Sequence, residues 1–197
     1  MKIIAITTPK VSADDAYLIK ALLDKGVDFI HLRKPDSTAE ECRSLIKQLS
    51  REQTSRIIIH DYPELYDEFK LKGIHINKNI TSLPVGYKGF KTRSCHSFDE
   101  LVMYKNEYDY LFLSPIFDSI SKAGYKSGFS SEDLLRASQS GIIDSKVVAL
   151  GGVTFDKLDY LQSLNFGGVA MIGGLYNKNI ISNLKCDSLL RWCFRGS

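Results

Sequence analysis

Short apolar runs alternate along the chain with longer segments whose apolar residues recur at helical spacing. The first run, residues 2–7, is rich in β-branched side chains, which is typical of a buried strand. The segment Ser12-Ala-Asp-Asp15 then provides a helix N-cap signal, and the helix that follows is predicted to end at Gly26. Similar apolar runs predict further strands at residues 27–33, 56–60, 74–77, 90–94, 108–113, 146–150 and 168–172.

Helices are predicted between consecutive strands, with one exception. Apolar residues three and four positions apart mark the clearest of them, at residues 42–49. No such pattern surrounds Leu83-Pro84, so the helix after the fourth strand is expected to be reduced or missing. The remaining helices are expected at residues 63–71, 98–102, 132–138 and 158–164, with a closing helix at 189–194.

This order of elements predicts an α/β fold with parallel strands, either closed into a barrel or doubly wound. Eight predicted strands, with very short loops before them, favour a compact (β/α)₈ barrel of the TIM type. At 197 residues the chain is expected to form one domain, over residues 1–197.

Charge, hydropathy and cysteine spacing limit which binding partners and which cellular compartment are expected for the chain. The net charge is +3, but Lys and Arg are scattered, so nucleic acid is not an expected partner. No apolar stretch approaches the roughly 18 residues of a membrane span, and no signal peptide is evident. The cysteines lack Cys-x-x-Cys spacing, so we expect a cytoplasmic protein with four reduced thiols, at Cys42, Cys95, Cys186 and Cys193.

Polar residues at the carboxyl ends of the strands are the candidates for chemistry, because the active sites of barrel enzymes lie at the face that these ends form. All four histidines fall in or just after predicted strands, at positions His31, His60, His75 and His96. Each histidine alone is more often structural than catalytic. A zinc site built from several of them is an alternative, which the absence of a tight local ligand motif disfavours.

Charged and glycine-rich segments suggest an anionic ligand. Arg33 shares a strand face with His31, so it is either an anion contact or half of an ion pair at the rim. Asp61 could hold a hard cation such as Mg²⁺ together with substrate. A polar loop after the sixth strand offers Ser119, Ser121 and Lys122, which suit a phosphate unless this is an ordinary surface loop. Backbone phosphate sites are indicated after the last two strands by Gly151, Gly152, Gly173 and Gly174.

Seven segments in chain order carry a resemblance to a known family. They are Phe29-Ile-His-Leu-Arg33, Ile57-Ile-Ile-His-Asp61, Gly73-Ile-His-Ile, Ser94-Cys-His96-Ser, Ser114-Pro-Ile-Phe with Ser-Ile-Ser-Lys122, Ala149-Leu-Gly-Gly-Val153, and Val169-Ala-Met-Ile. Over nearly its whole length the chain resembles the thiamine phosphate synthase/TenI superfamily. The resemblance implies a barrel transferase that couples hydroxymethylpyrimidine diphosphate with thiazole phosphate and releases pyrophosphate.

The resemblance also implies roles for individual residues. Asp61 would be a Mg²⁺ ligand, and His31 and His60 stand at substrate-binding positions. The diphosphate would be bound, and its departure assisted, by Arg33, Ser119, Ser121 and Lys122. The phosphate of the thiazole would bind at Gly151, Gly152, Gly173 and Gly174.

Several positions depart from the synthase pattern. His31 replaces a glutamine, His60 an asparagine and Pro35 a lysine, and no second metal carboxylate stands near Asn79. These changes favour the TenI branch, which isomerises the thiazole ring and would use His96 as general acid and base. The retained Lys122 and its neighbouring hydroxyls favour the synthase. A third alternative is a phosphate-binding barrel without catalytic activity.

Overall fold

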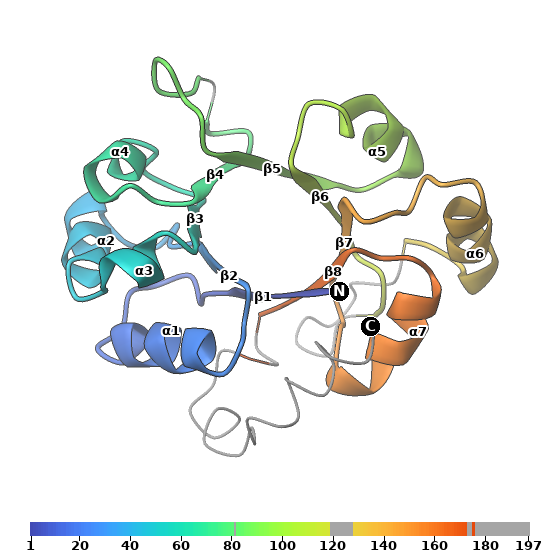
Figure 1. Ribbon diagram of the computed structural model, residues 1–197, viewed down its shortest axis with the longest axis horizontal. Helices are drawn as coiled ribbons and strands as arrows, with labels where there is room; N and C mark the ends of the chain where they lie inside the picture. The colour runs from blue at the N-terminus through green and yellow to red at the C-terminus, as the bar shows by residue number, and fades with distance from the viewer. Residues whose placement is uncertain (81, 119–127, 173–174, 176–197) are drawn as a thin grey trace.

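Eight parallel strands close into a barrel, in agreement with the fold predicted from the sequence (Figure 1). The computed structural model of the chain describes residues 1–80, 82–118, 128–172 and 175. Neighbouring strands in the barrel are also consecutive in the chain, and β1 pairs with β8 to complete the ring. The strands are β1 (Lys2–Ile6), β2 (Phe29–Leu32), β3 (Ile57–Ile59), β4 (Gly73–Ile76), β5 (Phe90–Cys95), β6 (Tyr110–Leu113), β7 (Val147–Leu150) and β8 (Gly168–Met171).

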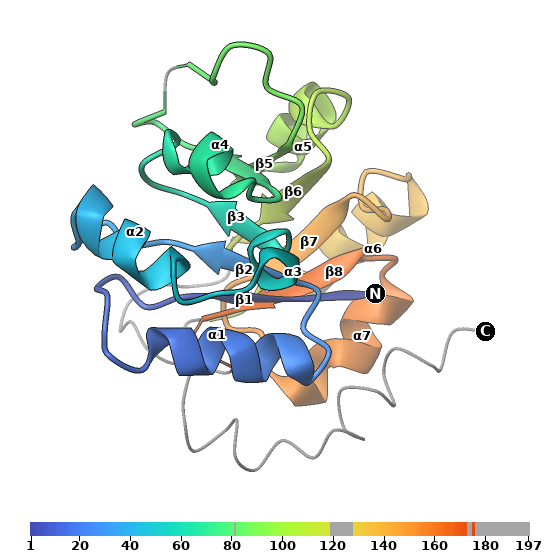
Figure 2. The ribbon, with the colours of Figure 1, turned by 60° about the vertical axis from the view of Figure 1, so that its left-hand side comes forward.

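The helices surround the barrel (Figures 1 and 2). They are α1 (Asp15–Asp24), α2 (Ala39–Ile46), α3 (Arg51–Thr54), α4 (Leu65–Phe69), α5 (Phe98–Tyr104), α6 (Ser131–Gln139) and α7 (Leu158–Ser163), which follows a 3₁₀ turn at Phe155–Lys157. Between β4 and β5 the described residues contain no helix, as predicted. The short α3 was not predicted, and the closing helix expected at 189–194 lies outside the described residues. No helix among the described residues is long and apolar enough to cross a membrane.

Local side-chain caps fix where most of these helices begin. Thr38 and Ser50 each accept a hydrogen bond three residues ahead, and a returning Glu or Gln side chain completes a capping box. The N-cap signal predicted at residues 12–15 lies at the start of α1: Asp14 is the N-cap residue, and the Asp15 carboxylate accepts the Ser12 backbone N–H at 2.9 Å. Asp15 is fully buried, and its carboxylate has a second partner, the ammonium of Lys34.

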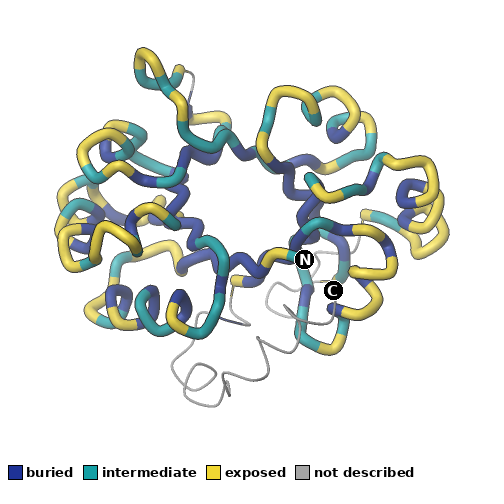
Figure 3. Tube along the Cα trace, in the orientation of Figure 1, coloured by how far each residue is buried: buried dark blue, intermediate teal, exposed yellow. Residues whose placement is uncertain are grey.

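Strand residues alternate between two apolar cores. On β6, Leu111 and Leu113 pack in the outer core beneath the helices, whereas Tyr110 and Phe112 face the barrel interior. Most strand residues are buried, with β5 the least so, and exposed residues concentrate on the helices and loops (Figure 3). The interior cluster is formed by Ile4, Ile6, Ile58, Tyr110, Phe112, Val148 and Ala170.

The interior also encloses polar side chains from four consecutive strands. His31, His60, His75 and Thr92 are all buried, and each has a hydrogen-bonding partner. Burial lowers the pKa of all three histidines, to about 3 for His75. The rings are therefore neutral at pH 7, because a charged imidazolium would lose its hydration inside the barrel.

A buried ion pair joins the end of β2 to the start of α1. The Lys34 ammonium donates to the Asp15 carboxylate at 2.6 Å, and both side chains are essentially inaccessible to solvent. Lys34 also donates to the backbone oxygen of Lys10 at 3.0 Å. The two charges are thus desolvated together and fix the β1–α1 connection against β2.

Breaking this pair should destabilise the fold strongly. Lys34→Met leaves the Asp15 carboxylate buried without its ammonium, and the free energy of unfolding should fall by about 3–5 kcal/mol. In the double variant Asp15→Asn/Lys34→Met, a neutral amide can still accept the Ser12 N–H, so part of the loss should be recovered. Urea denaturation at pH 7 measures both. A single variant as stable as the native chain, or a double variant no better than the single, would contradict this account.

The neutral histidines should make stability fall as pH falls. Below the ordinary histidine pKa of 6.5, the unfolded chain takes up protons that the buried rings do not. Each such histidine lowers the free energy of unfolding by about 1.4 kcal/mol for every unit by which the pH falls, from about pH 6.5 down to the folded-state pKa of that histidine. His31→Gln should remove one such contribution from the urea stability measured between pH 7 and pH 5. His96→Gln, at an exposed position, is the matched control. Equal pH slopes for native and His31→Gln proteins would argue against the buried neutral rings.

Candidate active site

A cavity of about 540 Å³ opens where β2, β3, β4 and β5 end. Its position agrees with the general placement of barrel active sites at the carboxyl ends of strands. The apolar part of its lining includes Ile6, Phe112, Leu150 and Ile172. The polar part is formed by Arg33, His60, Asp61, His75, Asn77, Lys78, Asn79, Arg93, Ser94, His96 and Glu100. Four residues predicted from the sequence therefore share one cavity: Arg33, His60, Asp61 and His96.

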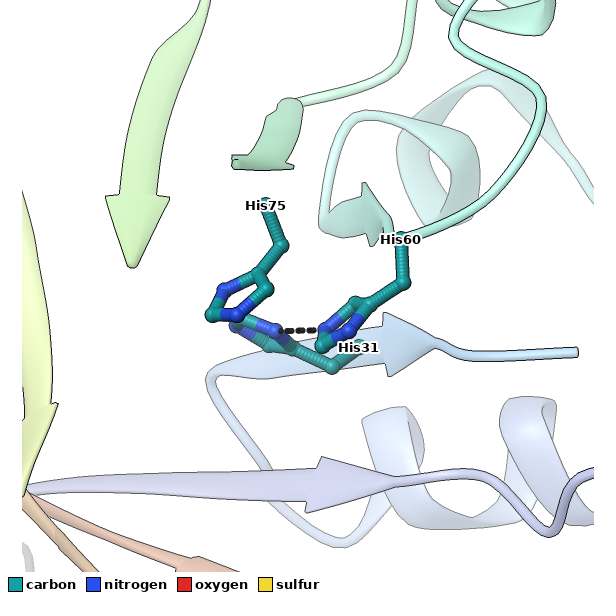
Figure 4. A group of neighbouring side chains, drawn as sticks. All are labelled: His31, His60 and His75. Atoms are coloured by element: carbon teal, nitrogen blue, oxygen red, sulfur yellow. Dashed lines mark hydrogen bonds between the residues drawn. The ribbon is translucent and has the colours of Figure 1, made fainter. Parts of the chain in front are cut away.

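Three histidine rings meet where the cavity passes into the barrel interior (Figure 4). His31 Nδ1 lies 2.7 Å from His60 Nε2, and the His60 ring stacks on His75 with centroids 4.0 Å apart. His60 and His75 line the cavity, whereas His31 is fully buried beside them. The predicted substrate contact of His31 is therefore not part of the cavity lining; His31 bonds to His60 and to the hydroxyl of Tyr110.

Arg33 and Asp61 bring opposite charges to the rim. Arg33 is exposed, and its backbone is held by reciprocal hydrogen bonds with the Thr7 hydroxyl, each 3.0 Å long. Among the described residues, no carboxylate forms an ion pair with Arg33, so the rim ion pair considered as an alternative is not seen there. Asp61 accepts the backbone N–H of Lys34 at 2.9 Å, which fixes its carboxylate at the cavity edge.

Pro35 stands where the synthase pattern has a lysine, and the neighbouring Lys34 does not supply the missing positive charge to the cavity. Its ammonium is bound by Asp15 beneath α1, away from the cavity. Lys78 lines the cavity and is exposed, but no sequence motif pointed to it.

The synthase pattern has a second metal-binding carboxylate near Asn79, and in this chain asparagines occupy that region. Asn77 donates to the backbone oxygen of His60 at 2.8 Å and accepts the backbone N–H of Asn79 at 2.8 Å. Asn77 thus joins the ends of β3 and β4, while Asn79 is exposed and also lines the cavity. This edge offers amide oxygens in addition to the single carboxylate of Asp61.

His96 has a defined orientation and tautomer. Its Nδ1 lies 2.8 Å from the backbone oxygen of Ser114, which can only accept, so Nδ1 carries the proton in the neutral ring. The backbone N–H of His96 donates to Glu100 at 2.5 Å. These two contacts leave Nε2 as the basic nitrogen of an exposed ring that lines the cavity.

The glycine pair after β7 is required by packing against the segment after β6. Gly151 and Gly152 have φ values of +93° and +62°, which side chains disfavour. A Cβ on Gly151 would lie 2.9 Å from Pro115, and one on Gly152 only 2.5 Å from the backbone oxygen of Asp118. Neither glycine is among the lining residues. The other predicted phosphate contacts, Ser119, Ser121, Lys122, Gly173 and Gly174, lie outside the described residues.

Some cavity residues were not selected from the sequence. Ser94 donates to or accepts from His75 Nε2 at 3.2 Å, and Phe112 packs against the His31 and His75 rings. Period-two alternation along β5 and β6 would have placed both side chains on the inner face. Glu100 had a different signal, the capping pattern Ser97-x-x-Glu100 at the start of α5, but that pattern does not show that its carboxylate accepts the backbone N–H of His96.

Several proteins similar to this chain are named for one activity. The chain is 34% identical to a thiamine phosphate pyrophosphorylase from Bacteroides thetaiotaomicron, with a TM-score of 0.86 and 98% of each chain covered. It is 25% identical to the thiamine-phosphate synthase of Lactococcus lactis, covering 90% of this chain and 89% of the relative. A thiamine phosphate pyrophosphorylase from Pyrococcus furiosus shares the fold, with a TM-score of 0.74 at 18% identity.

The family model for thiamine monophosphate synthase matches residues 3–175, from the first strand to the end of the barrel. This match confirms the resemblance and the transferase class that the sequence motifs predicted. The chain belongs to the thiamine monophosphate synthase family.

Proposed function

We propose that this barrel forms thiamine phosphate, by joining hydroxymethylpyrimidine diphosphate to thiazole phosphate with release of pyrophosphate. The observation that carries the proposal is the meeting of Arg33, Asp61 and His96 on one cavity at the strand ends. Its volume of about 540 Å³ suits phosphorylated heterocycles of this size. The synthase relatives support the same reaction class.

In this reaction the bond between the pyrimidine methylene carbon and the diphosphate oxygen breaks, and negative charge grows on the departing diphosphate. Arg33 supplies a guanidinium that can bind phosphate oxygens in a bidentate manner. Its backbone is already fixed by Thr7, so little ordering is needed when the diphosphate binds. Lys122, Ser119 and Ser121 remain proposed contacts of the same group.

The donor set fits Mg²⁺ held jointly by protein and substrate. Mg²⁺ prefers oxygen ligands and is often bound by one or two carboxylates together with substrate phosphates. Asp61 would be the carboxylate, and the exposed amide of Asn79, which also lines the cavity, would take the place of the second. When bound, the ion would neutralise charge on the diphosphate.

The thiazole phosphate is proposed to bind near Gly151 and Gly152, with Gly173 and Gly174 contributing from the next strand end. The thiazole nitrogen forms the new bond to the pyrimidine methylene carbon as the bond from that carbon to the diphosphate oxygen breaks. Because this nitrogen carries no proton, the step needs no base. His96 would then position the heterocycles through Nε2, as a hydrogen-bond acceptor.

Isomerisation of the thiazole ring is a second candidate function, favoured by the fixed tautomer of His96. The Nδ1–H bond to Ser114 leaves Nε2 free to take a proton and return it elsewhere on the ring. The residues around His96 are compatible with both reactions, so the two candidates are separated by assay.

The coupling reaction should depend on Arg33. With both thiamine precursors and Mg²⁺, the purified protein should produce thiamine phosphate and pyrophosphate, and chelation of Mg²⁺ should stop it. Arg33→Gln should lower kcat/KM for the pyrimidine diphosphate roughly 10- to 100-fold, the usual range for one charge-assisted bond. Arg136→Gln, on the exposed face of α6, is the control. Absence of product, with no effect of chelation, would remove the synthase proposal.

The tautomerase candidate predicts a different dependence on His96. His96→Asn keeps a side-chain N–H for the Ser114 oxygen but loses the basic nitrogen. Isomerisation of the thiazole precursor supplied alone should then fall at least 100-fold, as expected for loss of a general base. Thiazole phosphate should still bind, as measured by calorimetry. If the native protein does not isomerise the ring, this second function is ruled out.

A further inference from the structure

Three imidazoles from consecutive strands converge at the inner end of the cavity. His31 lies on β2, His60 directly follows β3, and His75 lies on β4 (Figure 4). One ring nitrogen from each comes within 4.8 Å of the other two, and all three side chains are buried. No step of the coupling reaction described above uses this group.

Two of the rings are oriented by polar partners on their far side. His31 Nε2 lies 2.5 Å from the Tyr110 hydroxyl, and His75 Nδ1 lies 2.9 Å from the Thr92 hydroxyl. Metal-binding histidines commonly use the second ring nitrogen in this way, which fixes the tautomer and aims the other nitrogen inward. These hydroxyls leave the other nitrogen of each ring: His31 Nδ1, which meets His60 Nε2, and His75 Nε2, which lies 3.2 Å from the Ser94 hydroxyl. A bound ion would replace both of these contacts.

We propose that His31, His60 and His75 form a binding site for a late first-row divalent ion, with Zn²⁺ as the expected occupant. Three neutral imidazoles are a donor set for Zn²⁺, Co²⁺ or Cu²⁺, and they suit Mg²⁺ poorly. Because His60 and His75 also line the cavity, a fourth coordination position would face it. The site is separate from the oxygen donors of Asp61 and does not depend on the coupling reaction.

Binding would exchange contacts between the rings for bonds to the ion. Metal–nitrogen distances of about 2.0–2.1 Å in a tetrahedral site place ligand nitrogens about 3.3 Å apart. The 2.7 Å contact between His31 and His60 would therefore open, and wider pairs would close. The stacked His60 and His75 rings, inclined by only 12°, would splay, because a bound ion lies in the plane of each ring. The cavity gives the ion a path to the site.

Cobalt titration tests the proposal directly. The full-length, tag-free protein, stripped with chelator, should bind one Co²⁺ and develop the intense visible absorption of a tetrahedral ion, and Zn²⁺ should displace it. His31→Gln and His60→Asn should each weaken Zn²⁺ binding more than roughly 100-fold. This exceeds the loss expected when the residue removed only hydrogen-bonds to a metal ligand. Thr92→Val, which removes such a partner from His75, should weaken it roughly 10- to 100-fold.

His96→Asn and Asp61→Asn are the matched controls, because both residues line the cavity but lie outside the three-histidine group. Both should bind Co²⁺ as the native protein does. Circular dichroism of the metal-free variants checks folding, and Zn²⁺ should raise the Tm of the native protein but not of folded His31→Gln. The proposal is overturned if no tetrahedral spectrum appears, if folded His31→Gln and His60→Asn bind normally, or if His96→Asn abolishes binding. Thiamine phosphate formation is measured separately and can fail independently.

Discussion

Closure of the eight-stranded sheet is the constraint on which the other features depend. Once β1 pairs with β8, inward-facing side chains share a small space. Polar groups there are shielded from water and must form hydrogen bonds with one another. The histidines of β2 and β4, together with His60, meet this requirement through each other, Tyr110 and Thr92. The same closure brings the strand ends to one face, so Arg33, Asp61 and His96 share a cavity although they are distant in sequence.

The fold could be predicted largely because its signals are local. Each strand is a short apolar run, and each helix after it has a cap or an apolar face, so the eight repeats are visible one at a time. The missing helix after β4 was predicted for the same reason. Local signals did not show that Asp15, in the first turn of α1, is buried against Lys34, a partner 19 residues away.

The candidate site was predictable only in part. Strand-end position was enough to select Arg33, His60, Asp61 and His96, which do line one cavity. Spacing alone could not show that His31 lies beside the cavity in contact with His60, because that depends on strand register. The glycine pair was selected for phosphate binding, yet the contacts that require glycine there are with Pro115 and Asp118. That requirement comes from tertiary packing and has no signature in a single sequence.

The close approach of Gly151 and Gly152 to the segment after β6 ties two parts of the molecule together. Ile116 and Phe117 donate backbone hydrogen bonds to Leu150 and Gly151, so the two strand ends are joined by main chain as well as by packing. A side chain added at either glycine therefore requires the segment after β6 to move. The regions assigned to the two substrates are expected to diversify as a single unit, which limits the routes by which descendants of this barrel can acquire new ligands.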